Sequence, residues 1–580
     1  MSNLIRRHRM MVSTLIICLL LGAVGSARPS AAQGSVYYVS TTGIDTPSHG
    51  TNVNPWLTIT YALTQVPDGS TILVKPGEYV GRVRLSGNFA QGVTVRSEVP
   101  YQARLRNTAD KVITTYDGCS GITLEGFDIA HGGEGAVALV VHIDGGGEQN
   151  FVHHLTLYNN IIHDSYNNDI LKINNGAHDI TVRGNMFYNQ SGSDEHMDVN
   201  SVVDVIIEDN VFFNDFAGSG RTNDNDTSAY VVIKDSNSDD DWVLGSKNIT
   251  VRRNVFLNWQ GSTGYGFVQV GEDATANFEA DGVLVENNLM LGNSANTLRS
   301  PIGIMGSRAV TFRNNTVVGN FPSLAFALRL YRINPNQPNQ DIFYYNNVWS
   351  DPTGTLEDFS DSPSGQTTSF AIERNLYWNN GAAIPQDSNE LVNYTNDAQR
   401  LIANPLLGSQ TGLIVPRWNP GTNHFADGST SIRAAFEKLV ALYGTPASTS
   451  PIVNAADPTH APGDDILGHA RTTPDLGAVE FVPTLILHGA SRSHAIDLNW
   501  TISAALPATS TWRLAYYSQT VPITINTIVS PTRAYELNGL TNYVWYTVTL
   551  QAMLGTLPFL TDTIKLMPTD RLVYLPLILK

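Results

Sequence analysis

Short segments in which apolar and polar residues alternate recur along the middle of the chain, and each is followed by an asparagine and a second short apolar run. Apolar residues at every second position predict strands rather than helices, because the side chains of a strand alternate between its two faces. The eight segments are LTLYNNIIHD around Asn160, ITVRGNMFYN around Asn185, VIIEDNVFFN around Asn210, ITVRRNVFLN around Asn254, VLVENNLMLG around Asn288, VTFRNNTVVG around Asn315, FYYNNVWSD around Asn347 and FAIERNLYWN around Asn375.

The spacing of these asparagines predicts a solenoid. Consecutive ones are 25, 25, 44, 34, 27, 32 and 28 residues apart, and a constant minimum with a variable excess is typical of coils whose loops carry insertions. Residues 169–195 contain one turn of three strands, DILKIN, ITVRG and MFYNQ. An asparagine suits the corner between two strands, because it tolerates left-handed backbone and can hydrogen-bond to its equivalents in a stack. We therefore predict an all-β fold with a parallel β-helix of three strands per turn.

The repeat also predicts the domain boundaries. The β-helix is expected to occupy residues 36–380, with a short N-terminal helix covering its first coil, since an open end would expose unpaired strand edges. Residues 381–482 lose the repeat and contain an amphipathic helix at 431–444, so we expect them to form a C-terminal cap. Residues 484–568 alternate again and predict a separate small β-sandwich.

The first coil resembles the start of many secreted right-handed β-helix proteins of the pectate-lyase-like superfamily. The run from Asp465 to Phe481 is similar to the closing segment of many such proteins. The resemblance implies a right-handed helix with a long groove along the first strand of each turn, where members that act on polysaccharides carry their catalytic residues. The matching residues at the start are Tyr37 to Ser40, Gly43, Asp45, Pro55, Trp56, Thr58, Ile59, Ala62, Leu63, Asp68, Gly69 and Pro76 to Tyr79.

The predicted sandwich contains the stretch LNGLTNYVWYTVTLQA, in which Tyr546 follows Leu540 by six residues. This stretch resembles a fibronectin type III domain. The resemblance implies that Tyr546 forms the tyrosine corner of the sandwich.

Both ends of the chain have the character of targeting segments. Residues 1–32 combine three early arginines with a short apolar run and small residues, which predicts a secretory signal peptide cleaved after Ala32 or Ala27. A retained membrane anchor is the alternative. Residues 569–580 end in the apolar RLVYLPLILK, which is too short to span a membrane as a helix. We interpret this tail as a terminal strand or as a recognition tail for attachment to the cell envelope.

Composition narrows the partners of the protein. The 580 residues carry a formal net charge of −17, which argues against nucleic acid as a partner because no basic stripe is present to neutralise phosphates. Of the two cysteines, Cys18 lies in the predicted signal and Cys119 remains alone, so we expect no internal disulfide. We interpret Cys119 as a core residue. The mature protein is predicted to be a secreted or cell-surface monomer without a membrane span.

Period-2 alternation predicts which side chains of the first strand in each turn face outward. In HMDVN, for example, Met197 and Val199 are expected inside, so that the polar residues between them face out. Neighbouring strands lie about 4.8 Å apart, so these outward residues form a ladder. The predicted ladder contains His142, Asp144, Lys172, Asn174, His196, Asp198, Asn200, Tyr230, Lys234, Phe267, Gln269, Arg329 and Tyr331.

Such a mixture of cations, carboxylates, amides and aromatic rings suits β-elimination on a polysaccharide that contains uronic acid. The reaction requires neutralisation of the substrate carboxylate, a base for the C5 proton and a proton donor for the leaving oxygen. The candidates for base and acid are Lys172, His196, Lys234 and Arg329. The candidates for substrate binding are His142, Asn174, Asp198, Asn200, Tyr230, Gln269, Tyr331 and, in a long insertion beside the ladder, Trp242.

Calcium is a candidate cofactor, because an acidic protein that acts on an acidic polymer otherwise meets net repulsion. Ca²⁺ prefers oxygen ligands, and oxygen-rich loops lie close to the ladder. The candidate ligands are Asp194, Glu195, Asp224 and Asp226.

The segment LKINNGAHDITVRGNMF is loosely similar to the Asn-Lys-Ser coil of the chondroitinase B/alginate lyase family. This similarity implies a catalytic role for Lys172. The next coil departs from the pattern of that family, because Glu195-His196-Met197-Asp198 stands in place of its Arg-His-Gly run and the catalytic arginine is missing.

Two classes of function therefore remain. The first is a polysaccharide lyase, with an epimerase or a hydrolase of the same fold as variants. A hydrolase requires carboxylates that converge at about 5–10 Å, and the predicted ladder contains only Asp144 and Asp198, on different coils. The second class is a non-catalytic glycan-binding or adhesin-like surface protein, which the absence of a complete known catalytic motif favours. Fold alone does not decide between them.

Overall fold

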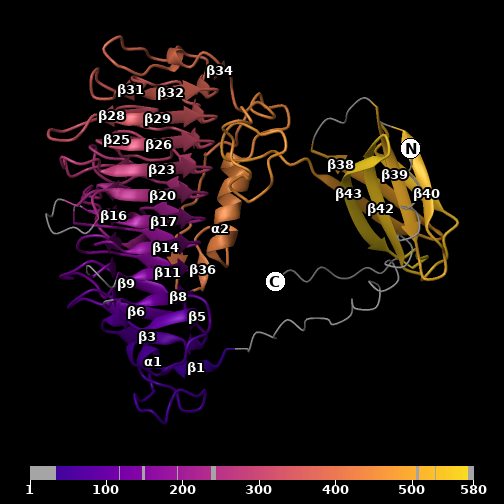
Figure 1. Ribbon diagram of the computed structural model, residues 1–580. Coiled ribbons are helices and arrows are strands. Elements are labelled where there is room, and N and C mark those ends of the chain that lie inside the picture. Colours follow the sequence, from indigo (N-terminus) through magenta and orange to yellow (C-terminus); the bar gives the residue numbers. More distant parts are fainter. Residues whose placement is uncertain are drawn as a thin grey trace, which may run out of the picture.

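The computed structural model describes residues 34–571, except residues 117, 147–150, 193, 237–242, 504–508 and 530. The predicted signal peptide, Trp242 and residues 572–580 of the tail lie outside this part of the chain. Three long parallel sheets wind around a common interior, and the chain visits them in the same order in every turn (Figure 1). The all-β fold and the parallel β-helix with three strands per turn are thereby confirmed.

The first of these sheets, which we call sheet A, contains the alternating strand that precedes each repeated asparagine. Its register pairs equivalent positions of successive coils, for example Leu155 with Ile180. Its strands, in spatial order, are β1 (Val36–Val39), β2 (Thr71–Val74), β5 (Asn88–Ser97), β8 (Ser120–Glu125), β11 (His153–Tyr158), β14 (His178–Arg183), β17 (Val203–Glu208), β20 (Ser246–Arg252), β23 (Ala280–Glu286), β26 (Arg308–Arg313), β29 (Gln340–Tyr345) and β32 (Phe370–Glu373).

Sheet B contains the short apolar run that follows the asparagine. Most of its strands have three or four residues and are buried throughout, so both of its faces are covered. Its strands are β3 (Gly77–Val80), β6 (Ala103–Asn107), β9 (Asp128–His131), β12 (Ile161–His163), β15 (Met186–Tyr188), β18 (Val211–Phe213), β21 (Val255–Leu257), β24 (Leu289–Leu291), β27 (Thr316–Val318), β30 (Val348–Asp351), β33 (Leu376–Asn379) and β34 (Leu401–Ile402).

Sheet C completes each coil and carries the predicted ladder. Its strands are β4 (Val83–Leu85), β7 (Ile113–Thr115), β10 (Val141–Asp144), β13 (Leu171–Asn174), β16 (Glu195–Asn200), β19 (Ala229–Lys234), β22 (Val268–Val270), β25 (Ile302–Met305), β28 (Leu328–Tyr331) and β31 (Ser360–Asp361).

The repeated asparagines form a continuous hydrogen-bonded stack at the corner between sheets A and B. The backbone N–H and the side-chain amide of Asn185 both donate to Oδ1 of Asn210, at 2.8 and 3.2 Å, and the same pattern repeats from Asn160 to Asn375. Asp397 ends the stack as the acceptor for Asn375. The predicted left-handed backbone lies one residue earlier, for example at Asp209 (φ 59°), and not at the asparagine itself. The stacked asparagine therefore supplies hydrogen bonds, whereas its predecessor turns the chain.

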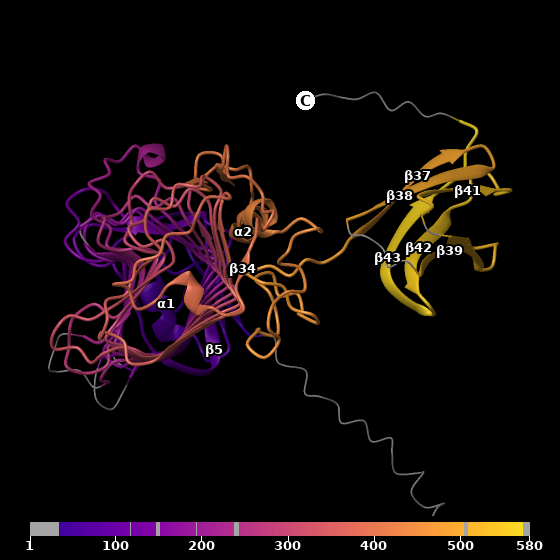
Figure 2. The same cartoon turned by 90° about the horizontal axis from the view of Figure 1, so that it is seen from above.

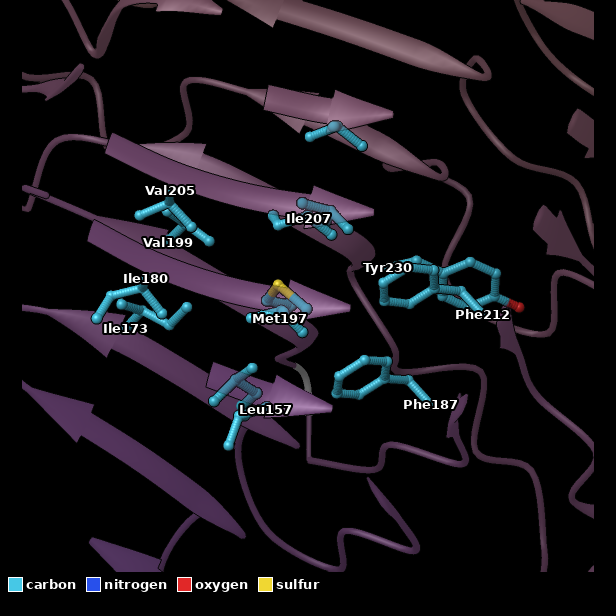
Figure 3. Close-up of a cluster of buried hydrophobic side chains, with 14 of the residues drawn as sticks. Leu157, Ile173, Ile180, Phe187, Met197, Val199, Val205, Ile207, Phe212 and Tyr230 are labelled. Carbon is cyan, nitrogen blue, oxygen red and sulfur yellow. The ribbon is translucent and has the colours of Figure 1, made fainter. Parts of the chain in front are cut away.

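The interior is filled by apolar side chains that stack from coil to coil (Figure 3). Most strands alternate as predicted, but several strands of sheet C, including β10, β13, β16 and β19, are entered through two consecutive inward residues. Val140 and Val141 are one such pair, and Ile170 and Leu171 are the next. The alternation therefore breaks where the chain bends from sheet B into sheet C. This local irregularity decides which residues of the ladder reach the outer face.

Each end of the β-helix is covered by a short segment. At the N-terminal end, α1 (Ile59–Gln65) packs Ile59, Ala62 and Leu63 onto the first coil, and the side chain of Thr58 caps this helix. At the other end, Val392 and Tyr394 of the segment around η2 (Tyr394–Asn396) pack against the last interior residues. Residues 381–400 therefore cover the C-terminal end of the β-helix, a role that we had expected of the whole range 381–482.

The remainder of that range, from residue 403 to 481, does not close the end of the β-helix. It runs back along the outer face of sheet B as far as the early coils, where the rings of Trp418 and Tyr101 lie 5.0 Å apart. Figure 2 shows α2 (Ile432–Leu439) outside the stack of coils. The predicted cap is wrong for this part, because the outer face of sheet B is apolar and has to be covered. The remaining elements here are β35 (Trp418–Asn419), β36 (His424–Phe425) and η3 (Val440–Gly444).

The last described unit is a β-sandwich of two antiparallel sheets, as the alternation predicts. Thr541 donates its backbone N–H to the hydroxyl of the buried Tyr546 at 3.0 Å, and Tyr546 is the first residue of β42 (Tyr546–Leu554). Trp500 and Trp512 lie in its core. The strands are β37 (Leu485–Arg492), β38 (Ala495–Ile502) and β41 (Ala534–Asn538) in one sheet and β40 (Thr524–Val529), β39 (Ser510–Tyr517), β42 (Tyr546–Leu554) and β43 (Leu557–Leu566) in the other. No helix in the described part of the chain is long and apolar enough to cross a membrane.

Candidate active site

Four charged residues from two neighbouring coils form a compact group on the outer face of sheet C. Lys172 lies in β13, and Asp169 lies two positions before that strand. Glu195 and Asp198 lie in β16, the neighbouring strand. In each of these two coils, the two inward residues at the bend into sheet C separate the two charged residues that face outward. The bend therefore places both charged residues of a coil on the outer face. We call Asp169, Glu195 and Asp198 the acidic cluster. It forms because the strands stack in register, with Lys172 opposite Asp198.

The acidic cluster is buried and tightly packed. One carboxylate oxygen of each member lies within 4.8 Å of those of the other two, and all three residues are at most 3% exposed. Nζ of Lys172 lies 2.6 Å from Oδ2 of Asp198 and 3.9 Å from Oδ2 of Asp169. The hydroxyl of Ser228 donates to Oε1 of Glu195 at 2.7 Å. Three carboxyl groups thus share one buried space with a single ammonium group.

Burial and repulsion between carboxylates favour the protonated form of two members of the acidic cluster, Asp169 and Glu195. Burial, followed by repulsion from Asp198, raises the pKa of Asp169 to about 7. Burial and the neighbouring Glu272 and Asp169 raise the pKa of Glu195 well above its usual range. Burial also raises the pKa of Asp194 beside the cluster. A bound cation would favour the ionised form of each of these groups.

The oxygen atoms of the site fit a divalent cation. Oδ2 of Asp169, Oδ1 of Asp198 and Oδ1 of Asn200 are buried and have no hydrogen-bond partner among the described residues. Unpaired buried oxygens are costly unless something compensates their charge. Calcium takes six to eight oxygen ligands, including carboxylates and side-chain amides. The donor set therefore suits Ca²⁺, and it includes Asp169 as a candidate ligand that the sequence pattern did not single out.

A second lysine, Lys234 of β19, lies one coil beyond the acidic cluster. Its Nζ is 2.6 Å from Oε2 of Glu272 and 3.3 Å from Oδ2 of Asp273. Burial opposes its positive charge, but Asp198 and Glu272 outweigh this and raise the pKa of Lys234. Burial likewise opposes the charge of Lys172, and Asp198 and Asp169 raise its pKa. Both amines are therefore held as ammonium groups while the surrounding carboxylates remain uncompensated.

The neighbours of the cluster include three further predicted residues. Asn200 donates to Oδ2 of Asp198 at 3.0 Å. One coil before Lys172, Nε2 of His142 lies 3.0 Å from Oδ1 of Asn174, and burial lowers the pKa of His142. These residues surround the cluster on the same face, as the alternation predicts.

The predicted ligands of the insertion loop lie outside the cluster. Oδ2 of Asp226 accepts a hydrogen bond from the backbone N–H of Gly192, and Asp224 is exposed. Neither aspartate belongs to the group of converging carboxylates. The loop that contains them instead leads into Ser228, which contacts Glu195.

The prediction that Phe267 faces outward is wrong, because its ring is fully buried in the core. The prediction that His196 and Tyr230 face outward is wrong too. Both are fully buried and stack on each other with ring centroids 4.3 Å apart. Figure 3 shows Tyr230 among the buried side chains of the interior. Burial lowers the pKa of His196 to about 3, so its ring is a neutral core group held by Asn214. Each of these residues is the first of the two inward residues that enter its strand, and strict alternation therefore misplaces it.

The remaining candidates form a separate group further along sheet C. Arg329 lies three coils beyond Lys234 and pairs with Asp361. Gln269 and Tyr331 contact each other at 3.2 Å between Nε2 and the hydroxyl. Arg329 therefore lies too far from the acidic cluster to act on the same atom as Lys234, since three strand spacings amount to about 14 Å.

The alternation missed Asp169, Glu272, Asp273, Arg299 and Asp361. Of these five residues, only Asp169 could have been found from a pattern in the sequence. An acidic residue directly precedes the two inward residues Ile170 and Leu171, as Glu195 precedes His196 and Met197. The others lie in loops or at strand ends, where no period exists to place them.

A hollow of about 590 Å³ over sheet A is the alternative location for a site. Its lining contains His154, Asp179 and Asp204 together with threonines and apolar residues. His154 and Asp179 are largely exposed, with side chains 65% and 43% accessible. Solvent therefore screens the charges of these two side chains.

Comparison with known proteins adds little at the level of sequence. No family model matches the chain, and no curated protein matches it. Among solved structures, the chain is similar to pectate lyase Pel9A, with 15% identity, a TM-score of 0.45 and coverage of 78% of this chain and 97% of that one. A rhamnogalacturonan lyase has 13% identity, a TM-score of 0.40 and coverage of 71% and 99%.

Proposed function

We propose that the protein is a Ca²⁺-dependent polysaccharide lyase that cleaves a uronate polymer by β-elimination. The observation that carries the proposal is the buried acidic cluster, with its unpaired oxygens, next to two lysines on an outer sheet face. A purely structural role does not require three converging buried carboxyl groups, two of which, Asp169 and Glu195, have raised pKa values.

The acidic cluster and Asn200 are the proposed ligands of the cation. When bound there, Ca²⁺ offsets the substrate carboxylate and thereby acidifies the C5 proton. Lys172 remains paired with Asp198 and orients its carboxylate. Of the predicted ligands, Glu195 belongs to this set, which Asp169 and Asp198 complete, whereas Asp194 lies beside the cluster and is not among the converging carboxylates.

Lys234 is the proposed base. Its contacts are Glu272 and Asp273, which are not members of the acidic cluster, so its amine stays free of the ligands. The negative charges of Asp198 and Glu195 help to raise the pKa of Lys234. A cation bound to these carboxylates would offset their charges and so favour the neutral form of Lys234. The neutral amine takes the C5 proton, the bond from C4 to the glycosidic oxygen breaks and a C4–C5 double bond forms. The leaving oxygen takes a proton from solvent.

The first experiment follows the ultraviolet absorbance of the unsaturated product while the protein is incubated with pectate, alginate or chondroitin. We expect a rise with Ca²⁺ that chelation abolishes. Replacing Lys234 by alanine is expected to lower the rate by about 10²–10⁴-fold, the usual contribution of a general base. Lys247→Ala is the matched control, because Lys247 is an exposed lysine of β20 on sheet A.

Each of the other outcomes has a definite meaning. Loss of activity in Lys172→Ala with full activity in Lys234→Ala would reverse the roles of the two lysines. Cleavage without the new absorbance would identify a hydrolase. Polymer binding without any cleavage would replace the lyase by the glycan-binding protein that the sequence leaves open.

Secretion belongs to the same proposal. A lyase for extracellular polymers requires export, for which residues 1–32 are the proposed signal peptide. The sandwich at residues 484–568, proposed as a fibronectin type III domain, and the apolar tail would attach the enzyme to a surface. N-terminal sequencing of exported protein tests the signal, and we expect cleavage after Ala32 or Ala27. Export with an intact N-terminus would instead support the retained anchor.

A further inference from the structure

Three coils beyond Lys234, the outer face of sheet C carries a group of two arginines and one aspartate. Nε of Arg299 and Nε of Arg329 donate to the same atom, Oδ2 of Asp361, at 2.9 and 2.8 Å. Nη2 of Arg299 also contacts this oxygen. Two guanidinium groups share one carboxylate, so the group keeps one uncompensated positive charge. The chain as a whole is strongly negative, which makes such a group unusual on this molecule.

The two arginines have donors to spare. Neither terminal nitrogen of Arg329 makes a hydrogen bond within the described part of the chain, and Nη1 of Arg299 makes none there either. The side chains of Arg299 and Arg329 are 33% and 21% exposed, so a ligand can reach them. A guanidinium presents its N–H groups as a planar fork that matches the two oxygens of a carboxylate.

Packing holds this fork in place. The guanidinium of Arg329 lies 3.5 Å from the ring centroid of Tyr331, which supports it by a cation–π contact. The amide of Gln269 donates to the hydroxyl of that tyrosine. Gly303 lies between Gln269 and Arg329 in the stack, and a Cβ atom there would lie 2.3 Å from Oε1 of Gln269. The missing side chain therefore leaves room for the amide to lie along the sheet and reach Tyr331.

We propose that Arg299 and Arg329 form a second substrate site, which binds a carboxylate of the polymer several sugar units away from the bond that is cleaved. The identity of the reacting unit rests on the proposed function, but carboxylate binding at the arginines does not. The strand of Arg329 lies about 14 Å from the strand of Lys234 along the stack, and Arg299 comes one coil earlier. A polymer that repeats carboxylates would meet the cation site at one end and the guanidinium groups at the other.

This arrangement makes the protein selective for polymers that are charged along their length. Methyl esterification removes the charge of each uronate and one acceptor of the bidentate contact, so an esterified chain loses the interaction with both arginines. The site would thus discriminate by charge pattern and not only by the sugar at the bond that breaks.

The test measures equilibrium binding of polygalacturonate to the full-length Lys234→Ala protein in the presence of Ca²⁺. This background prevents cleavage during the titration. We expect Arg299→Gln and Arg329→Gln each to weaken binding by about tenfold, the usual effect of losing a hydrogen bond to a charged partner. Arg308→Gln is the matched control, because Arg308 pairs with Asp281 in the same way on sheet A. Fully methyl-esterified polygalacturonate is expected to bind weakly to all variants.

Arg329→Lys separates binding from a structural role. It keeps the charge beside Asp361 but lacks the fork, so we expect normal thermal stability with weakened binding. With Lys234 restored, Arg329→Gln is expected to raise KM on the polymer with little change in kcat, since the contact is made equally in ground and transition states.

The outcomes distinguish this proposal from the lyase itself. Binding that is equal in Arg329→Gln, Arg299→Gln and the parent protein would overturn the second site and leave the lyase untouched. Failure of the parent protein to bind polygalacturonate, alginate or chondroitin would also overturn it. Binding that depends on the arginines, without any cleavage by the protein with Lys234, would support the second site and reject the lyase.

Discussion

Asn254 illustrates how single residues connect the coils. Its Oδ1 accepts hydrogen bonds from the backbone and side chain of Asn210, both at 3.0 Å, and its amide donates to Ile207 and Asn288. All of these groups are buried. A buried polar group that loses its partner costs more than the bond contributed, so the stack tolerates no gap.

We therefore expect Asn254→Ala to lower the free energy of unfolding of the β-helix by about 3 kcal/mol, because it leaves the Asn210 N–H groups without an acceptor. Chemical denaturation measures this change. Asn52→Ala is the control, since Asn52 is exposed near the N-terminal end. A loss of less than about 1 kcal/mol would show that the stack does not need each of its members.

A second buried network makes stability depend on pH. His163 lies 2.9 Å from Asp128 and 2.7 Å from Asp164, which in turn contact Arg106 and Arg221. Burial opposes the charge of His163, but the two aspartates outweigh it and raise the pKa of His163 above 6.5. Burial opposes the charges of both aspartates too, yet His163 and the arginines lower their pKa values below 3.8.

The directions of these pKa shifts define the pH range in which the network stabilises the protein. The contribution of His163 is complete below pH 6.5 and is lost as the pH rises through its higher folded pKa. The contribution of the aspartates is complete above pH 3.8 and is lost as the pH falls through their lower folded pKa values. We expect thermal midpoints of the protein to fall above pH 6.5 and less so in His163→Gln. Parallel pH profiles for the two proteins would contradict this.

At the scale of elements, the outer face of sheet B depends on the chain that returns along it. Phe436 of α2 is fully buried against residues from many coils, including Phe213 and Leu257. The side chain of Ser431 caps α2, and Arg417 reaches Asp215 at 3.0 Å beside it. A helix of eight residues has little stability alone, so packing against sheet B holds it in place.

Phe436→Ala is expected to destabilise the β-helix by about 3–5 kcal/mol, the usual cost of removing a buried phenylalanine. It should also expose an apolar face that promotes aggregation. Denaturation and light scattering measure both effects. Leu442→Ala is the matched control, because Leu442 belongs to the same segment but is 50% exposed. Equal stability of the two variants would mean that the returning segment is dispensable.

At the scale of the whole molecule, the proposed cation site would couple the proposed function to stability. A ligand that binds only the folded chain stabilises it by mass action, by about 2.7 kcal/mol when its concentration is a hundred times Kd. We therefore expect Ca²⁺ to raise the thermal midpoint and chelation to reverse the change. Asp198→Asn should abolish the shift, whereas Asp224→Asn should keep it, because Asp224 lies outside the acidic cluster. A Ca²⁺ shift that is kept in Asp198→Asn and lost in Asp224→Asn would instead place the cation site in the insertion loop.

Local pattern was enough to predict much of this molecule. Alternation and the asparagine spacing determined the three strands per coil, the stack at the corner and the outward positions of Lys172, Asp198 and Lys234. These features follow from backbone geometry within a few residues, where side chains must alternate and a repeated corner must repeat its hydrogen bonds.

Only the tertiary structure decided how distant coils combine. It brought Asp169 to Glu195 and Asp198 across 26 and 29 positions, turned His196 inward and laid residues 403–481 along sheet B. The sequence by itself determined the repeat and the chemistry available on the face of sheet C. The bend into each strand of that sheet decided which of those groups meet, because a corner is shaped by the coils stacked above and below it and carries no period of its own.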